Sequence, residues 1–132
     1  MPAESAIRSH KDLEVWKEAV SLAERLYRET SHFPREENYG MTAQIRRAAV
    51  SVAANIAEGY GRGQTTQFVQ FLRISQGSAQ ELDTHVILAE RFGYFAPQTS
   101  IELQDTCQKL SKVLRSLIQS LETKIKGDSA MR

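Results

Sequence analysis

The chain has 132 residues, with 17 Lys and Arg against 16 Asp and Glu. This length suits one domain with a modest core, and the balanced charge provides no overall attraction to a polyanion. The single cysteine, Cys107, excludes an intrachain disulfide and fits a reducing cytosol, and no stretch resembles a signal peptide or a membrane span. We therefore expect a cytoplasmic protein.

The first elements are a flexible leader over residues 1–10 and a helix near residues 12–31. Asp12 is the expected N-cap of this helix, and Pro34 follows its end because proline cannot continue a helix. The expected apolar stripe repeats every three or four residues and comprises Leu13, Trp16, Val20, Ala23 and Tyr27.

A second helix, near residues 40–60, has very few charges. Between positions 41 and 60 only Arg46, Arg47 and Glu58 are charged. One stripe is apolar and contains Met41, Ile45, Ala48, Val52 and Ile56. A helix without a solvated face must be covered on all sides, so we expect it to be central to a bundle and to a subunit interface.

The sequence GYGRG then predicts a turn, because glycines let the chain reverse. A third helix follows near residues 65–92, with Thr65 or Thr66 as its cap, and a fourth near residues 99–126. The expected core positions of the third helix are Phe68, Phe71, Leu72, Ser75, Ala79, Leu82, Val86 and Ala89, and those of the fourth are Ile101, Leu103, Cys107, Leu110, Leu114, Leu117 and Leu121. Residues 11–126 are thus expected to form one all-α domain, an up-down-up-down antiparallel four-helix bundle, before a flexible tail over 127–132.

A polar stripe accompanies the apolar one on the second helix. If the second and third helices form a hairpin about the GRG turn, residues whose numbers sum to about 125 lie opposite each other, which places Arg47 near Ser78 and Gln44 near Glu81. We expect Arg46 or Arg47 to pair with Glu81 as a buried charge pair. The predicted structural polar network contains Gln44, Arg46, Arg47, Ser51, Asn55, Glu58, Ser78 and Glu81, together with Asp83. The favoured role is setting register and subunit contacts, and a ligand or nucleic-acid role is the alternative.

Basic residues suggest a second kind of site. Lys109, Lys112 and Arg115 recur on the fourth helix, and Arg62 lies in the GYGRG turn. These four residues are the candidate nucleic-acid contacts, although an ordinary solvated bundle face is the favoured explanation of the basic residues on the fourth helix. GYGRG itself is a poor phosphate loop, because no strand precedes it and no Gly-Lys-Ser/Thr follows.

Catalytic and metal-binding patterns are weak. Glu29 and His32 form a single Glu-x-x-His, whereas a di-iron bundle needs two copies. His85 is an ordinary helix position, and Cys107 lies on an apolar seam, where a packed thiol is expected. We expect no catalytic residues, no cofactor and no metal, and hence no enzyme activity.

The order of short motifs resembles a known family. These motifs are Asp12-Leu13 with Val15-Trp16, Phe33-Pro34 with Glu37, Tyr39-Gly40, Arg46-Arg47-Ala48, Asn55-Ile56-Ala57-Glu58-Gly59, Phe71-Leu72, Gly77-Ser78, Glu81-Leu82 and Gly93-Tyr94. They resemble the four-helix-bundle proteins encoded in 23S rRNA intervening sequences, once described as a ribosomal protein. The resemblance is close over residues 10–95 and looser in the last helix.

The resemblance implies a left-handed bundle assembled as a homopentameric ring, association with ribosomal RNA, and no enzymatic activity. A structurally similar group assists diversity-generating reverse transcriptases. The sequence therefore favours a non-enzymatic ring that binds structured RNA, and the alternative is a protein-interaction adaptor or scaffold, including an accessory to a reverse transcriptase. RNA binding should weaken steeply with salt, whereas adaptor binding should not.

Overall fold

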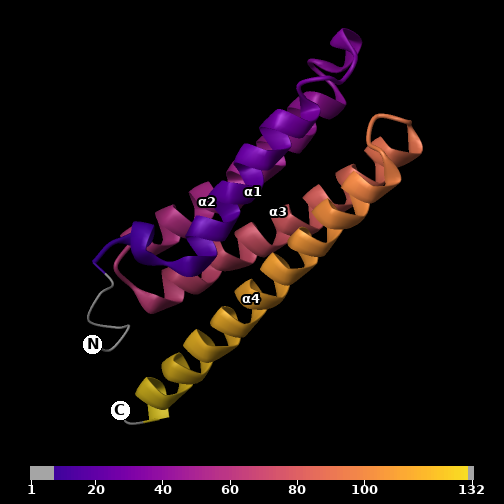
Figure 1. Cartoon of the computed structure of the whole chain (residues 1–132). Helices are drawn as coiled ribbons and strands as arrows, with labels where there is room; N and C mark the ends of the chain where they lie inside the picture. The colour runs from indigo at the N-terminus through magenta and orange to yellow at the C-terminus, as the bar shows by residue number, and fades with distance from the viewer. Residues whose placement is uncertain (1–7, 131–132) are drawn as a thin grey trace.

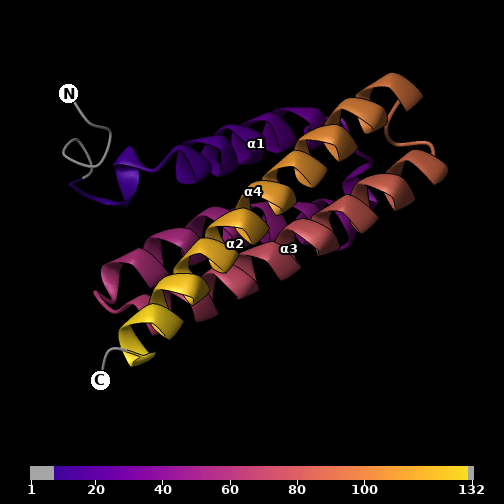
Figure 2. The ribbon, with the colours of Figure 1, turned by 90° about the horizontal axis from the view of Figure 1, so that it is seen from below.

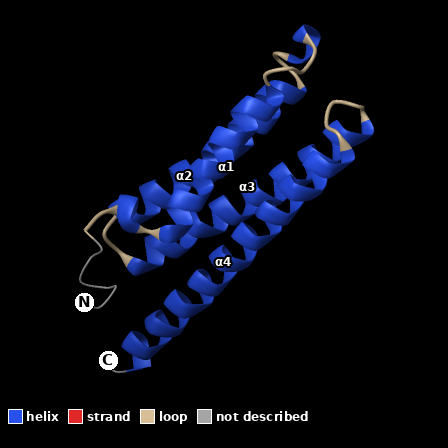
Figure 3. Cartoon of the chain, in the orientation of Figure 1, coloured by secondary structure: helices blue, strands red, loops and turns tan. Residues whose placement is uncertain are grey.

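The computed structural model describes residues 8–130, in which every regular element is helical. The four long helices are α1 (Glu14–Thr30), α2 (Met41–Gly61), α3 (Thr65–Arg91) and α4 (Pro97–Ala130), joined by short turns (Figure 1). Two single-turn 3₁₀ helices, η2 (His10–Asp12) and η3 (Arg35–Glu37), precede α1 and α2. Figure 3 shows only helix and loop in this part of the chain, which confirms the all-α class with four helices.

The N-terminal boundary differs from the expected one. Asp12 does not cap α1; its carboxylate accepts hydrogen bonds from the backbone N–H groups of Arg8 at 2.7 Å and Ser9 at 3.3 Å, within a capping box around η2. Leu13 occupies the N-cap position of α1. Residues 8–10 of the expected leader therefore have defined structure, and residues 1–7 lie outside the described range.

The last two helices also begin and end differently. Gln64 is the N-cap of α3, and no side chain caps that end, so neither Thr65 nor Thr66 has the expected role. Pro97 is the first residue of α4, where its fixed φ suits a helix start. The helix continues to Ala130, so residues 127–130 of the expected tail are helical, and residues 131–132 lie outside the described range.

All four helices contribute to one core, and most of the predicted positions belong to it. On α2 and α3 the predicted seams are buried from Ile45 to Ile56 and from Leu72 to Ala89. On α4 the prediction for Ile101 is wrong, because this side chain is 60% exposed, and Ile118 is buried instead. None of the helices in residues 8–130 combines the length and apolarity needed to cross a membrane.

The stripe predicted on α1 is displaced by about one position. The buried residues are Val15, Ala19, Leu22, Leu26 and Thr30, whereas Tyr27 of the predicted stripe is 46% exposed. Leu13, Trp16 and Ala23 of that stripe are only partly buried against the core. Both stripes repeat every three or four residues and lie side by side on the helix, so periodicity alone does not choose between them.

The register between α2 and α3 differs from the predicted one by about one helical turn. Arg47 pairs with Glu81 and Ser51 with Ser78, whereas the prediction placed Arg47 near Ser78. Because the partner's number falls as the α2 number rises, the two helices run in opposite directions. Side chains lean toward the N-terminus of their own helix, which moves each contact by about one residue per helix. The turn between Gly61 and Thr65 is also centred slightly later than expected.

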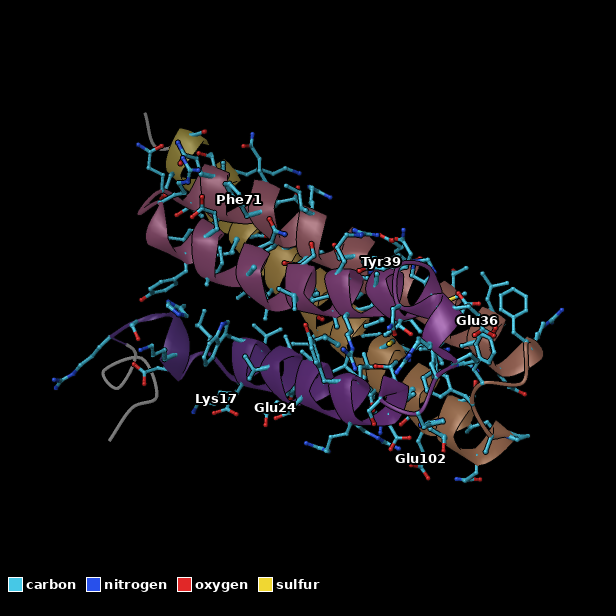
Figure 4. The ribbon with its side chains drawn as sticks, turned by 90° about the horizontal axis from the view of Figure 1, so that it is seen from above. Lys17, Glu24, Glu36, Tyr39, Phe71 and Glu102 are labelled. Atoms are coloured by element: carbon cyan, nitrogen blue, oxygen red, sulfur yellow. The ribbon has the colours of Figure 1, made fainter. Side chains whose placement is uncertain are left out.

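The helices α1 and α4 lie apart from each other over much of their length. Figures 1 and 2 both show them spreading toward the ends of the chain, while α4 follows α3 closely. They meet near the other end, where the Arg25 guanidinium donates to the Glu102 carboxylate at 2.6 Å. In Figure 4, Glu102 lies beside the C-terminal part of α1, and Lys17 and Glu24 project from α1 itself. Residues of α1 and α4 line a groove on this side of the bundle.

Candidate functional site

A polar row lies between α2 and α3, formed by Gln44, Arg47, Ser51, Asn55, Ser78 and Glu81. Ser51 and Ser78 share a hydrogen bond of 2.8 Å across the helices. The Asn55 amide donates to the Ser51 carbonyl at 2.8 Å and to its hydroxyl at 3.0 Å. Arg47 donates to Gln44 at 2.8 Å and also to Glu81. Two of these contacts, Ser51 with Ser78 and Arg47 with Glu81, join the two helices.

Three other members of the predicted network lie elsewhere. Arg46 points to α1, where it donates to the Thr30 hydroxyl at 3.0 Å and to the Tyr27 carbonyl at 3.1 Å. Glu58 accepts a hydrogen bond from Arg62 at 2.8 Å, at the C-terminal end of α2. Asp83 lies at a pocket between α3 and α4. Neighbouring positions on a helix differ by about 100° in direction, so Arg46 and Arg47 face different partners.

The charges of the polar row are accessible within the single chain, which contradicts the predicted buried pair. The side chains of Arg47 and Glu81 are 56% and 38% exposed. Hydrogen bonding from His85 at 3.0 Å, and then from Arg47, lowers the pKa of Glu81. This carboxylate is therefore held ionised by two donors, as suits a structural ion pair.

Beside the polar row lies a surface with almost no charge, which we call the α2–α3 outer face. It comprises the exposed residues Val50 and Ala54 of α2 and Ile74 and Gly77 of α3. Val50 is 47% exposed and Ile74 is 50% exposed. Exposed aliphatic side chains grouped on a charge-poor face are typical of a contact surface.

The four candidate nucleic-acid contacts do not form one patch. Lys109, Lys112 and Arg115 are exposed and follow one another at three-residue spacing, so they share one face of α4. Arg62 lies at the α2–α3 turn and is held by Glu58, with its guanidinium 5.1 Å from the centre of the Phe71 ring. That turn is near the C-terminal end of α4, since Gln64 and Asp128 line a common hollow. Sixteen residues of helix between Lys112 and Asp128 span about 24 Å.

The basic face of α4 borders the groove between α1 and α4. This groove has a volume of about 750 Å³, and Leu22, Leu110 and Val113 contribute apolar side chains to it. Lys17 and Arg25 line it from α1, and Lys109 and Lys112 line it from α4. Lys109 is paired with Asp105 at 2.9 Å. Sequence reasoning missed this groove because no local pattern reports the angle between two helices.

The titratable groups that most often catalyse reactions are dispersed. His10 packs edge-to-face against Trp16, His32 donates to the Tyr94 carbonyl at 3.2 Å, and His85 contacts Glu81. Cys107 is 1% exposed, and burial, followed by the negative charge of Asp83, raises the pKa of its thiol to about 12. Within residues 8–130, no three His, Cys, Asp or Glu side chains are grouped so that they could hold a metal ion.

The turn sequence GYGRG has a structural explanation. Gly63 has a φ of +74°, a conformation that glycine adopts without strain. A Cβ on Gly59 would lie 2.6 Å from the Phe71 Cβ, so the absent side chain lets α3 approach α2 closely. The glycines thus shape the hairpin, in agreement with the preferred interpretation of this motif.

These features define an all-α protein with four helices, a polar row between two of them and a basic face on the last. The family model for the 23S rRNA-intervening sequence protein matches residues 11–116, and the chain belongs to this family. The resemblance noted in the sequence is therefore confirmed.

A solved structure has a similar fold. It is a crystal structure of a protein of unknown function from the S23 ribosomal protein family of Bacteroides thetaiotaomicron VPI-5482. The TM-score is 0.73 at 23% sequence identity, over 80% of this chain and 95% of that chain. At this identity the likeness supports the fold alone. No curated protein matches the chain.

Proposed function

We propose that this protein is a non-enzymatic, cytoplasmic RNA-binding protein that acts as a homo-oligomeric ring. Each subunit is an up-down-up-down, left-handed antiparallel bundle, and the ring is a pentamer that closes through the α2–α3 outer face. The exposed basic face of α4 carries the RNA-binding part of the proposal, because its three cations point to solvent at regular spacing. The name of the family, which refers to an intervening sequence of 23S rRNA, supports structured ribosomal RNA as the ligand.

A modest cationic face gains strength by repetition. One subunit offers Lys109, Lys112 and Arg115, and a ring multiplies this set around its axis. Each phosphate neutralised releases counterions, so affinity for RNA rises with the number of cations and falls with salt. The face has no aromatic platform for stacking bases, so we expect it to bind the backbone of a folded RNA rather than read a sequence.

The test is the salt dependence of binding to a 23S rRNA fragment that contains the intervening sequence. The variant combines Lys109→Ala, Lys112→Ala and Arg115→Ala, and its control removes two exposed cations at other places, Arg35→Ala and Arg91→Ala. We expect the variant to lose affinity and its salt slope to fall by about one for each lost phosphate contact. An unchanged slope would refute this interface.

The second candidate is an adaptor for a protein partner, including a reverse transcriptase. The observation that favours it is the apolar floor of the groove between α1 and α4, formed by Leu22, Leu110 and Val113. Binding there should depend little on salt and should be lost on Val113→Ser, whose side chain is 43% exposed. If the variant that lacks Lys109, Lys112 and Arg115 still binds the partner, this result would identify the adaptor role as the function.

A further inference from the structure

A second, smaller pocket lies between α3 and α4, on the other side of Lys112 from the groove. Its volume is about 190 Å³. Gln80 and Asp83 line it from α3, and Gln108, Ser111, Lys112 and Arg115 line it from α4. A pocket of this size accepts one small planar group, and it is too small for a helix of a partner or for a base pair.

Two polar groups at this pocket have no partner in the protein. Ser111 is 9% exposed. Its Oγ and the buried Oδ1 of Asp83 have no hydrogen bond. Four such buried side-chain atoms occur in residues 8–130, and this pocket has two of them. An unpaired buried polar group is unfavourable by about 1–3 kcal/mol, so a group bound in the pocket that hydrogen-bonds to these two atoms would be stabilised.

The chemistry of these groups limits what they bind. An ionised carboxylate only accepts hydrogen bonds, so a ligand facing Asp83 must present N–H or O–H donors. Lys112 and Arg115 border the same pocket and form no ion pair within the described residues, so they favour an anionic group beside those donors. An unpaired nucleotide has both features, a base edge and a phosphate. Guanine fits best, because its N1–H and N2–H groups are adjacent donors on one edge.

We propose that the α3–α4 pocket binds one unpaired guanine nucleotide, with Asp83 and Ser111 facing the base and Lys112 and Arg115 facing its phosphate. The inference rests on the proposed RNA-binding function and adds a point of base recognition to it. Single-stranded loops and bulges present bases in this way, so the preferred RNA has an unpaired guanine near the backbone that contacts α4.

The probe is guanosine monophosphate, titrated into the full chain by calorimetry or amide NMR beside the adenosine, cytidine and uridine monophosphates. We expect saturable binding with a preference for the guanine nucleotide, and amide shifts around Asp83 and Ser111. Guanosine without phosphate should bind more weakly than the monophosphate, and this difference should vanish in Lys112→Ala with Arg115→Ala.

The decisive variant is Asp83→Asn, which keeps the shape of the side chain and replaces one acceptor by a donor. Guanine affinity should fall about tenfold, and preference should move toward adenine, whose edge pairs with an asparagine amide. Ser111→Ala should lower affinity several-fold, and Glu90→Gln, on the same helix, serves as the control. Circular dichroism of each variant verifies folding.

The remaining outcomes separate this inference from the proposed function. Equal binding of all four nucleotides, no binding of any, or an unchanged guanine preference in Asp83→Asn would overturn the pocket assignment. If RNA binding then persists with its salt slope, the proposed function stands alone. Conversely, guanine binding without RNA binding would support the pocket and refute the RNA-binding ring.

Discussion

The Arg46 guanidinium of α2 donates from Nε to the Thr30 hydroxyl of α1 at 3.0 Å and stacks over the Tyr27 ring at 4.3 Å. Thr30 is 2% exposed, and its hydroxyl also donates to the Leu26 carbonyl at 2.7 Å. This one contact ties the end of α1 to the start of α2, across the 3₁₀ connection. It also explains why Arg46 is not available to the polar row.

We therefore expect Arg46→Met to destabilise the fold by about 1.5–3 kcal/mol, because it removes hydrogen bonds from a charged donor. Urea unfolding followed by circular dichroism measures the loss. Arg28→Met is the matched control, since Arg28 is an exposed arginine on α1. Equal small losses in the two variants would show that the Arg46 contact contributes nothing.

A second prediction concerns the close approach of α2 and α3 at Gly59. An added Cβ would lie 2.6 Å from the Phe71 Cβ and 3.3 Å from the Phe68 carbonyl oxygen, so the helices must separate. We expect Gly59→Ala to lower the free energy of unfolding by about 1–3 kcal/mol, despite the better helix propensity of alanine. In Gly61→Ala the new Cβ meets nothing within 4 Å, and we expect no loss of stability.

The proposed ring makes a third prediction, for the α2–α3 outer face. Val50→Glu and Ile74→Glu should cost the isolated subunit little, because both side chains are about half exposed in it. In a ring each change places an unpaired charge in an apolar contact, which is strongly unfavourable. Sedimentation velocity should show smaller species with unchanged helix content. Val113→Glu, on α4, should leave the assembly intact, and a wild-type monomer at micromolar concentration would refute the ring.

A fourth prediction follows from the contact between Glu37 and Tyr94. The Met41 backbone N–H donates to the Glu37 carboxylate at 3.0 Å and the Tyr94 hydroxyl at 2.8 Å; in that order they lower the pKa of Glu37 from 4.5. The hydrogen bond between Tyr94 and Glu37 raises the pKa of Tyr94 above 10.0. A carboxyl group whose pKa is lowered by folding stabilises the folded state at pH values above its unfolded pKa, and this stabilisation is lost as the pH falls. A phenol whose pKa is raised by folding stabilises the folded state at pH values below its unfolded pKa, and this stabilisation is lost as the pH rises.

The pair should therefore stabilise the fold between pH 4.5 and 10.0 and progressively less outside that window. The measurement compares unfolding free energies of the wild type and Glu37→Gln from below pH 4.5 to above pH 10.0. Their difference should narrow at both extremes. Tyr94→Phe should abolish the alkaline change and weaken the acidic one, because only the Met41 N–H still donates to the Glu37 carboxylate. A difference that is constant with pH would contradict this account.

The fifth prediction concerns the buried Cys107 thiol. Because burial raises its pKa to about 12, almost none of it is thiolate at pH 8. A disulfide reagent should label the native protein only as fast as the protein opens, and labelling should be immediate in concentrated urea. Ser120→Cys adds an exposed thiol on the same helix as an internal standard. Equal rates at the two cysteines would show that the α4 seam is open to solvent.

The local sequence determined where the helices lie in the chain and much of which side chains each of them buries. The stripe from Ile45 to Ile56 was predictable because α-helix geometry is local and repeats every 3.6 residues. The prediction placed Arg47 near Ser78 and Gln44 near Glu81. The observed partners, Ser51 of Ser78 and Arg47 of Glu81, are about one turn away. The glycines around Arg62 indicated the hairpin because glycine adopts the positive φ that Gly63 has in this turn.

Only the tertiary structure decided how the helices are rotated and spaced. Three features depend on which neighbour each helix meets. They are the buried stripe of α1, the hydrogen bond from Arg46 to Thr30, and the pocket that Asp83 and Ser111 both line. Rotation by one residue moves a side chain by about 100°, and both alternatives satisfy the same sequence pattern. The packing of all four helices selects one of them, because core side chains must interdigitate at close to crystal density.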